Sequence, residues 1–146
     1  MESKVDIEQL LRDGQSIQMT VNGYSMYPML TPGRDMVILS PLPARRLRRG
    51  DVVLFRRENS ILVLHRVHRA AAEGLYMVGD NQTEVEGPLA YSQARAILTA
   101  FVRKGKKISV RQPIYRFVSR IWLLMRPFRH RLAVLAHKIK VMFRGV

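Results

Sequence analysis

The chain has 146 residues, no cysteine, and 25 basic residues against 11 acidic ones, which gives a formal net charge of +14. This length suits one domain with an appendage and is too short for two independent domains. The apolar fraction of 47% excludes wholesale disorder. The lack of cysteine excludes disulfide bonds, thiolate metal sites and a cysteine nucleophile.

The charges are unevenly distributed along the chain. All 11 acidic residues lie at or before Glu86, where 11 basic residues balance them, and the other 14 basic residues lie in residues 87–146. A charge-balanced front part is therefore followed by a purely cationic one. Such a segment favours an anionic partner, either a membrane surface or a nucleic acid.

Residues 1–16 predict a short N-terminal helix, because Ile7, Leu10 and Leu11 follow the i, i+3, i+4 spacing and Gly14 is a plausible stop. This segment is polar and acidic. A secretory signal needs a basic start and an apolar stretch, and neither is present. We therefore expect a cytoplasmic protein.

Residues 17–110 predict a mainly β, mostly antiparallel domain. Six short runs rich in β-branched and aromatic residues are separated by turn-forming residues, with no long helical pattern between them. These runs are IQMTV (17–21), DMVILS (35–40), DVVLF (51–55), ILVLHRVH (61–68), GLYMV (74–78) and AILTAFV (96–102).

Residues 111–146 predict a basic tail of two amphipathic helices separated at Pro127. Apolar residues recur at helical spacing at positions 114, 117, 118, 121, 122 and 125, and again at 132, 135, 139 and 142. A helix of about 12 residues is about 18 Å long, too short to cross a bilayer core of about 30 Å. Cationic helices of this kind can lie in the interface of an anionic membrane. The alternative is that the apolar stripes pack on the β-domain and the arginines face solvent.

Ser25 is the first candidate catalytic residue. It lies in the segment GYSMYPML directly after a predicted strand, and Pro28 limits the conformations of this loop. A serine held at a strand end, with its own N–H exposed, suits an acyl-transfer nucleophile. An isolated loop serine is more often a turn former.

His65 is the candidate base. On a strand it shares a face with Val63 and Val67, while His68 points the other way, so the H-x-x-H spacing does not favour a metal site. An imidazole with an ordinary pKa near about 6.5 is largely neutral at pH 7 and can accept a serine proton. A histidine among aliphatic residues can equally be structural.

Asp80 and Glu86 are the candidate acids. Asp80 lies in the turn sequence Gly79-Asp80-Asn81 and Glu86 follows shortly after. A carboxylate hydrogen-bonded to the base sets its tautomer and stabilises its cationic form. The sequence alone does not choose between the two.

Five short boxes follow one another along the chain: GYSMYPML, TPGRDMV, LRRGDVVLF, LVLHRV and VGDNQ. Their combination resembles the type I signal peptidase family and the related LexA-like self-cleaving repressors, over about residues 17–103. The resemblance implies the signal-peptidase/LexA-like β-fold and a serine nucleophile at Ser25. The base position is a lysine in bacterial signal peptidases and LexA-like proteins, but a histidine followed by Arg-Val in the endoplasmic-reticulum and archaeal type. Here it holds His65, which implies a Ser–His dyad.

The same resemblance places the Gly-Asp-Asn box on Gly79, Asp80 and Asn81, and a downstream acid approximately on Glu86. Many signal peptidases have a hydroxyl residue two positions before the nucleophile. Since this chain has Gly23 there, the Ser25 N–H is the expected oxyanion donor.

Together these inferences predict a signal-peptidase-like serine endopeptidase that cleaves a peptide or leader segment without a cofactor or metal, its substrate bound as an extended strand. The rival is a non-catalytic binding module whose basic tail contacts membrane or nucleic acid. Nucleic acid is the less favoured partner, because no helix-turn-helix precedes the β-domain and the apolar stripes suit lipid better than base stacking. We expect the protein in the cytoplasm, with the inner face of the membrane as its place of peripheral attachment.

Overall fold

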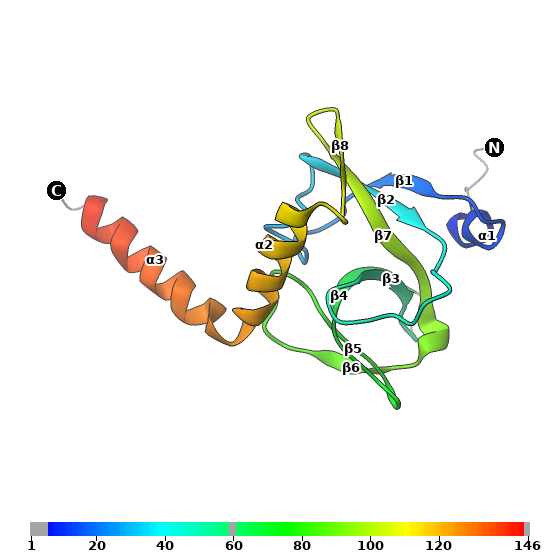
Figure 1. Ribbon diagram of the computed structural model, residues 1–146. Coiled ribbons are helices and arrows are strands. Elements are labelled where there is room, and N and C mark those ends of the chain that lie inside the picture. The colour runs from blue at the N-terminus through cyan, green and yellow to red at the C-terminus, as the bar shows by residue number, and fades with distance from the viewer. Residues whose placement is uncertain (1–5, 59–60, 145–146) are drawn as a thin grey trace.

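The computed structural model describes residues 6–58 and 61–144 and is mainly β, as the sequence predicts (Figure 1). Residues 1–5 of the predicted N-terminal helix lie outside the described residues. The helix itself is α1 (Ile7–Arg12), with Asp6 accepting a hydrogen bond from the Gln9 amide at its start. Gly14, which follows it, has a positive φ of 83°, a conformation that glycine adopts readily.

All eight strands belong to one antiparallel sheet, in the order β1-β2-β7-β3-β4-β5-β6, with β8 also paired to β7. The strands are β1 (Ile17–Thr20), β2 (Asp35–Ser40), β3 (Val52–Arg56), β4 (Leu62–Ala71), β5 (Gly74–Val78), β6 (Glu86–Leu89), β7 (Ala94–Arg103) and β8 (Lys106–Ser109). A 3-10 turn, η1 (Tyr91–Gln93), precedes β7. The six predicted strands are all present.

Two strands, β6 and β8, are additional to the prediction. Strand β6 has the sequence EGPL, and glycine and proline are rare in strand interiors. Strand β8 has the sequence KKIS, which lacks an alternating apolar pattern. Their pairing with β5 and β7 depends on the neighbouring strands rather than on their own composition.

The sheet separates two apolar clusters, and the central strand β3 contributes to both. Val52 and Leu54 join the first cluster, whereas Val53 and Phe55 join the second. This alternation follows from the two-residue period of a strand, whose successive side chains point to opposite faces. Strand β3 is therefore buried on both faces and lies at the centre of the fold.

The C-terminal part is helical, with a break at the predicted position. Helix α2 (Pro113–Leu124) is followed by the 3-10 turn η2 (Arg126–Phe128), which contains Pro127, and by α3 (Arg129–Arg144). Figure 1 shows α2 lying against the β-sheet body while α3 extends away from it. In the described part of the chain, no helix has the length and apolar content that a membrane crossing requires.

Candidate active site

The loop after β1 carries Ser25 and is fixed by two buried apolar side chains. Met26 and Leu30 both insert into the first apolar cluster, and the Leu30 amide donates to the Met26 carbonyl at 2.9 Å. Ser25 itself is half-buried between the exposed Tyr24 and Tyr27. Its position is therefore set by core packing on one side, while its surroundings stay open to a ligand.

A buried carboxylate closes the far end of this loop. Asp35, at the start of β2, accepts hydrogen bonds from Arg34, from Arg103 and from the Thr31 amide. Burial alone would raise the pKa of Asp35, but these bonds outweigh it and hold the pKa below its ordinary value. Arg34 and Arg103 also donate to the Met29 carbonyl, so Asp35 orders the loop through its arginines.

The turn that follows β5 packs directly on the main chain of Ser25. The Asn81 amide donates to the Ser25 carbonyl at 2.8 Å. A Cβ atom added at Gly79 would lie 2.6 Å from the same oxygen, closer than real Cβ contacts come. Glycine at 79 thus allows the turn to approach Ser25.

His65 lies at the same end of the β4–β5 hairpin. The β4–β5 ladder ends at the pair Arg66–Val78, one residue from both His65 and Gly79. The His65 side chain is only 3% exposed, and its ring packs edge-on against Phe55 at 5.9 Å between centroids. Strand pairing thus places the His65 main chain at the end of the hairpin whose following turn contacts the Ser25 main chain.

The surroundings of His65 favour its neutral form. Burial, followed by the nearby Arg57 charge, lowers the pKa of His65, while Glu86 and Asp80 act weakly in the opposite direction. Its Nδ1 atom is buried and has no hydrogen-bond partner. A neutral imidazole with an unused ring nitrogen can accept a proton.

The Ser25 loop and the end of the β4–β5 hairpin meet through the Gly79–Asn81 turn, but the side chains of Ser25 and His65 are not bonded to each other. Among the described residues, no hydrogen bond joins Ser25 Oγ to the His65 ring. The Ser25 amide likewise donates no hydrogen bond to any described residue, so this N–H is available to an oxyanion. The shared proton between the two side chains stays a prediction.

The two candidate acids have different partners from those expected. Both carboxylate oxygens of Asp80 accept from Arg66, at 2.7 and 2.8 Å, and both side chains are almost fully buried. Asp80 therefore orients Arg66 and makes no hydrogen bond to His65. Glu86 pairs with Arg57 through two hydrogen bonds of 2.9 and 2.8 Å, in a half-exposed position. Of the two acids, Glu86 has the larger electrostatic effect on His65.

The far side of the Gly79–Thr83 turn is held by the C-terminal helices. Trp122 donates through its indole N–H to the Asp80 carbonyl at 2.6 Å. Arg129 donates to three carbonyls of the turn, those of Gly79, Asp80 and Gln82, and also to the Trp122 carbonyl. Arg126 donates to the Thr83 carbonyl at 2.7 Å. We call these three side chains, Trp122, Arg126 and Arg129, the helix clamp.

Neither the clamp nor the buried partner role of Arg66 was predicted from the sequence pattern. Arginines in a basic tail resemble solvent-exposed charges, and only the folded chain brings them to backbone carbonyls. For Arg66 the sole signal was its place in the LVLHRV box. Trp122 is part of the predicted apolar stripe, but an indole N–H in a partly buried position usually has a partner.

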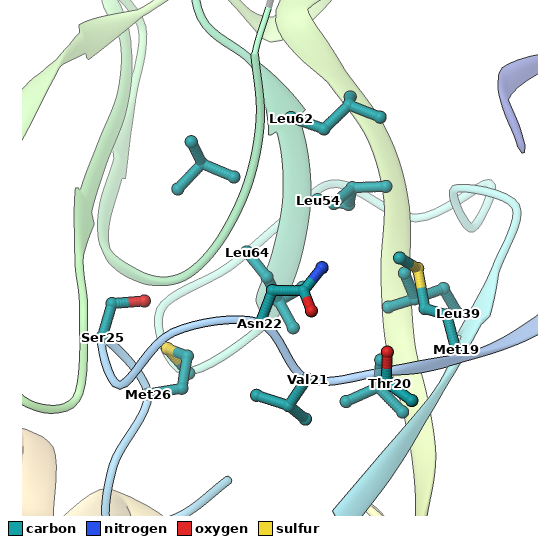
Figure 2. Close-up of a pocket in the computed structure, with 12 residues that line it drawn as sticks. Met19, Thr20, Val21, Asn22, Ser25, Met26, Leu39, Leu54, Leu62 and Leu64 are labelled. Atoms are coloured by element: carbon teal, nitrogen blue, oxygen red, sulfur yellow. The ribbon is translucent and has the colours of Figure 1, made fainter. Parts of the chain in front are cut away.

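Ser25 opens onto an apolar pocket of about 330 Å³ between β1 and the start of β4. Figure 2 shows the Ser25 hydroxyl pointing into this space. The pocket is lined by Met19, Thr20, Val21, Asn22, Ser25, Met26, Val37, Leu39, Leu54, Leu62, Val63 and Leu64. A mainly apolar wall with the Ser25 hydroxyl at its edge suits a peptide side chain next to a reacting carbonyl.

Comparison with known proteins identifies the family. The sequence pattern of a family described as Peptidase S24-like matches residues 2–98, and the chain belongs to this family. The search of curated proteins and the search of solved structures found no match.

Proposed function

We propose that this Peptidase S24-like protein is a serine endopeptidase of the histidine type, with Ser25 as nucleophile and His65 as general base. The observation that carries the proposal is the meeting of the Ser25 loop, the His65 strand and Gly79 at one end of the β4–β5 hairpin. The apolar pocket beside Ser25 supports a peptide substrate. The family match supports peptidase-type chemistry.

The substrate would bind as an additional strand between β1 and β4. Strand β1 is at one end of the sheet order and has a neighbour only in β2. Within the described residues, Leu62–His65 of β4 pair with β3 on one side and with no strand on the other. Unpaired strand edges offer main-chain hydrogen bonds to an extended peptide, and the pocket between them selects its side chains. The leader segment of a precursor protein suits such a groove.

The proposed reaction needs only one proton relay. Ser25 Oγ attacks the scissile carbonyl while its proton passes to His65, and the oxyanion accepts from the Ser25 N–H. The peptide C–N bond then breaks, and His65 returns the proton to the leaving amine. A water molecule then attacks the acyl-enzyme carbonyl while His65 takes its proton. The ester bond to Ser25 breaks, His65 returns the proton to Ser25 Oγ, and the carboxylic acid product is released. Glu86 supports the imidazolium electrostatically, in place of the direct hydrogen bond expected of Asp80.

The test uses a proteome-derived peptide library, with cleavage products identified by mass spectrometry. The wild-type chain should give new termini that share a residue preference before the cut. Ser25→Ala should reduce these products at least about a thousandfold, and His65→Ala by a similar factor, because nucleophile and base act as a unit. The control is Ser92→Ala, which changes an exposed serine that does not line the pocket.

The rival is a non-catalytic binding module that has kept the fold. The missing Ser25–His65 hydrogen bond is the observation in its favour. It predicts that no product depends on Ser25, even though library peptides are retained by the immobilised chain. That result, or products unchanged by Ser25→Ala, would reject the endopeptidase.

A further inference from the structure

Helix α2 turns its apolar stripe away from the protein. Its buried residues are Tyr115, Ser119 and Leu123, which face the β-domain. The outer face exposes five large apolar side chains, with Ile114 at 72% and Phe117 at 67% exposed. These five, which we call the outer stripe, are Ile114, Phe117, Val118, Ile121 and Leu124. Four residues of the predicted stripe are therefore exposed rather than packed on the β-domain, whereas its other two, Trp122 and Met125, are half-buried.

The outer stripe continues beyond α2. Phe128 in η2 is exposed, and so is every residue of 131–144 whose side chain is described. On α3 the exposed apolar residues include Leu135, Met142 and Phe143, the last at 77%. Figure 1 shows that α3 projects clear of the body, so no other described part of the chain covers its outer end. An apolar surface of this extent on a monomer marks an interaction site.

Cationic side chains flank the outer stripe without acidic neighbours. Arg116 and Arg120 are exposed on α2 beside it, and Lys138, Lys140 and Arg144 are exposed on α3. From residue 87 to 146 the sequence has no Asp or Glu. A partner for this surface must therefore be apolar in its interior and anionic at its rim.

An arginine-lined pocket lies against α2, and two of its arginines, Arg116 and Arg120, belong to that helix. It has a volume of about 490 Å³, and six arginines line it: Arg45, Arg48, Arg49, Arg111, Arg116 and Arg120. Its one acid is Asp51, whose carboxylate is already bonded to Arg45 and to the Arg48 amide. Arginine presents several N–H donors in a planar fork that suits phosphate.

We propose that the outer stripe, the arginine-lined pocket and α3 form a docking surface for an anionic phospholipid bilayer. The apolar side chains would enter the acyl boundary while the arginines contact lipid phosphates, as in helices that lie in the membrane plane. Charge complementarity selects this occupant, because a protein groove would have to supply acids along the full length of both helices. The proposal goes beyond the peptidase proposal and does not depend on Ser25.

The test is flotation of the full chain with two kinds of vesicle, phosphatidylcholine alone and phosphatidylcholine with phosphatidylglycerol. The wild type should float with the anionic vesicles and not with the neutral ones, and salt should weaken its binding. Phe117→Ser/Ile121→Ser should weaken binding more than about tenfold. Leu42→Ser changes an exposed apolar residue outside the surface and should leave binding unchanged.

Two double variants test whether the charges beside the outer stripe are required. Arg116→Gln/Arg120→Gln should weaken binding to anionic vesicles more than Arg12→Gln/Arg46→Gln, which removes the same charge from exposed sites elsewhere. Thermal unfolding should be alike for all these variants, since the changed side chains face outward. Ser25→Ala should float like the wild type, so failure of the peptidase proposal leaves this one intact.

Four results would overturn the proposal. The wild type could fail to float with anionic vesicles, or the outer-stripe variant could float equally well. The wild type could also form a dimer that Phe117→Ser/Ile121→Ser dissociates, with no vesicle binding, which would make the stripe an interface between copies. Binding to a DNA duplex but not to vesicles would assign the charge to nucleic acid.

Discussion

Arginine has different partners in the β-domain and in the C-terminal helices. In the β-domain, Asp35, Asp51, Asp80 and Glu86 each accept from at least one arginine, and Glu8 of α1 accepts from two arginines of the same domain. Among the described residues, no salt bridge includes a residue beyond Arg103. There Arg126 and Arg129 donate to backbone carbonyls, and others face solvent. Arginines of the first kind hold the fold together, whereas those of the second either position the Gly79–Thr83 turn or remain available to a partner.

Breaking the buried ion pair should have the largest effect on stability. Asp80→Asn removes the carboxylate charge opposite Arg66, and both side chains are almost fully buried. Leaving one charge buried without its partner costs about 3–5 kcal/mol. We expect this decrease in the free energy of unfolding at pH 7, measured by urea denaturation.

The matched control is the surface pair of the same residue types. Arg45 and Asp51 are bonded in a similar two-point geometry, but the Arg45 side chain is 39% exposed. Asp51→Asn should cost about 1 kcal/mol or less, because solvent screens such pairs. Equal losses for the two substitutions would show that burial is not what makes the Asp80 pair important.

Removing the central arginine of the helix clamp should have the next largest effect. Arg129→Met deletes the hydrogen bonds to the carbonyls of Gly79, Asp80 and Gln82. All three come from one guanidinium nitrogen and share its two N–H groups, so together they count as about one charged hydrogen bond, worth about 1.5–3 kcal/mol. The methionine keeps part of the packing, so a net loss of about 2 kcal/mol is expected. Because the same turn carries the Asn81 bond to Ser25, cleavage should fall as well.

Arg131→Met is the control, since Arg131 is exposed two residues further along the same helix. It should change neither stability, by more than about 0.5 kcal/mol, nor cleavage. A positioning role for Arg129 predicts that kcat falls more than KM rises and that Arg129→Lys restores part of the rate. A loss of stability with unchanged kcat would reduce the clamp to a structural support.

The sequence predicted the strands better than it predicted side-chain partners. The strand β2 was predicted because DMVILS is a short run with β-branched residues between turn-forming ones, and in the structure buried and half-buried residues alternate along Asp35–Ser40. The partner of Asp80 was not predictable in this way, because Arg66 and His65 are neighbours on β4 and point to opposite faces. Which of them meets the carboxylate depends on the side of β4 from which the turn after β5 approaches.

The orientation of α2 was also beyond the reach of the sequence. Helical periodicity showed that Ile114, Phe117 and Ile121 share a face, but it does not say whether that face meets the core or the solvent. The structure buries Ser119 and Tyr115 instead, and Tyr115 reaches Arg66 with its hydroxyl. The inner face is thus partly polar, because it covers a buried ion pair.

The pH dependence of cleavage should show a smaller effect, and the surroundings of His65 determine the direction of the shift. Because burial and the Arg57 charge lower the pKa of His65, the imidazole becomes protonated only below its ordinary range. The acidic limb of kcat/KM should therefore have a midpoint below about 6.5, the pKa of an unperturbed histidine. Arg57→Gln should move this midpoint upward, and Glu86→Gln should move it downward. A midpoint that neither substitution moves would show that another group titrates.

The smallest effect on stability is expected when a single charge of α3 is removed. This change distinguishes the role of the C-terminal helices from that of the β-domain most directly. Lys138→Gln removes an exposed charge on α3, the helix that extends away from the β-sheet body (Figure 1). Unfolding should therefore change by less than about 0.5 kcal/mol, and cleavage of a short peptide should be unchanged. Binding to anionic vesicles should nevertheless weaken about fivefold, since each basic residue near such a surface contributes about 1 kcal/mol. If Lys138→Gln altered peptide cleavage without vesicles, the charges of α3 would act on the Gly79–Thr83 turn rather than on a membrane.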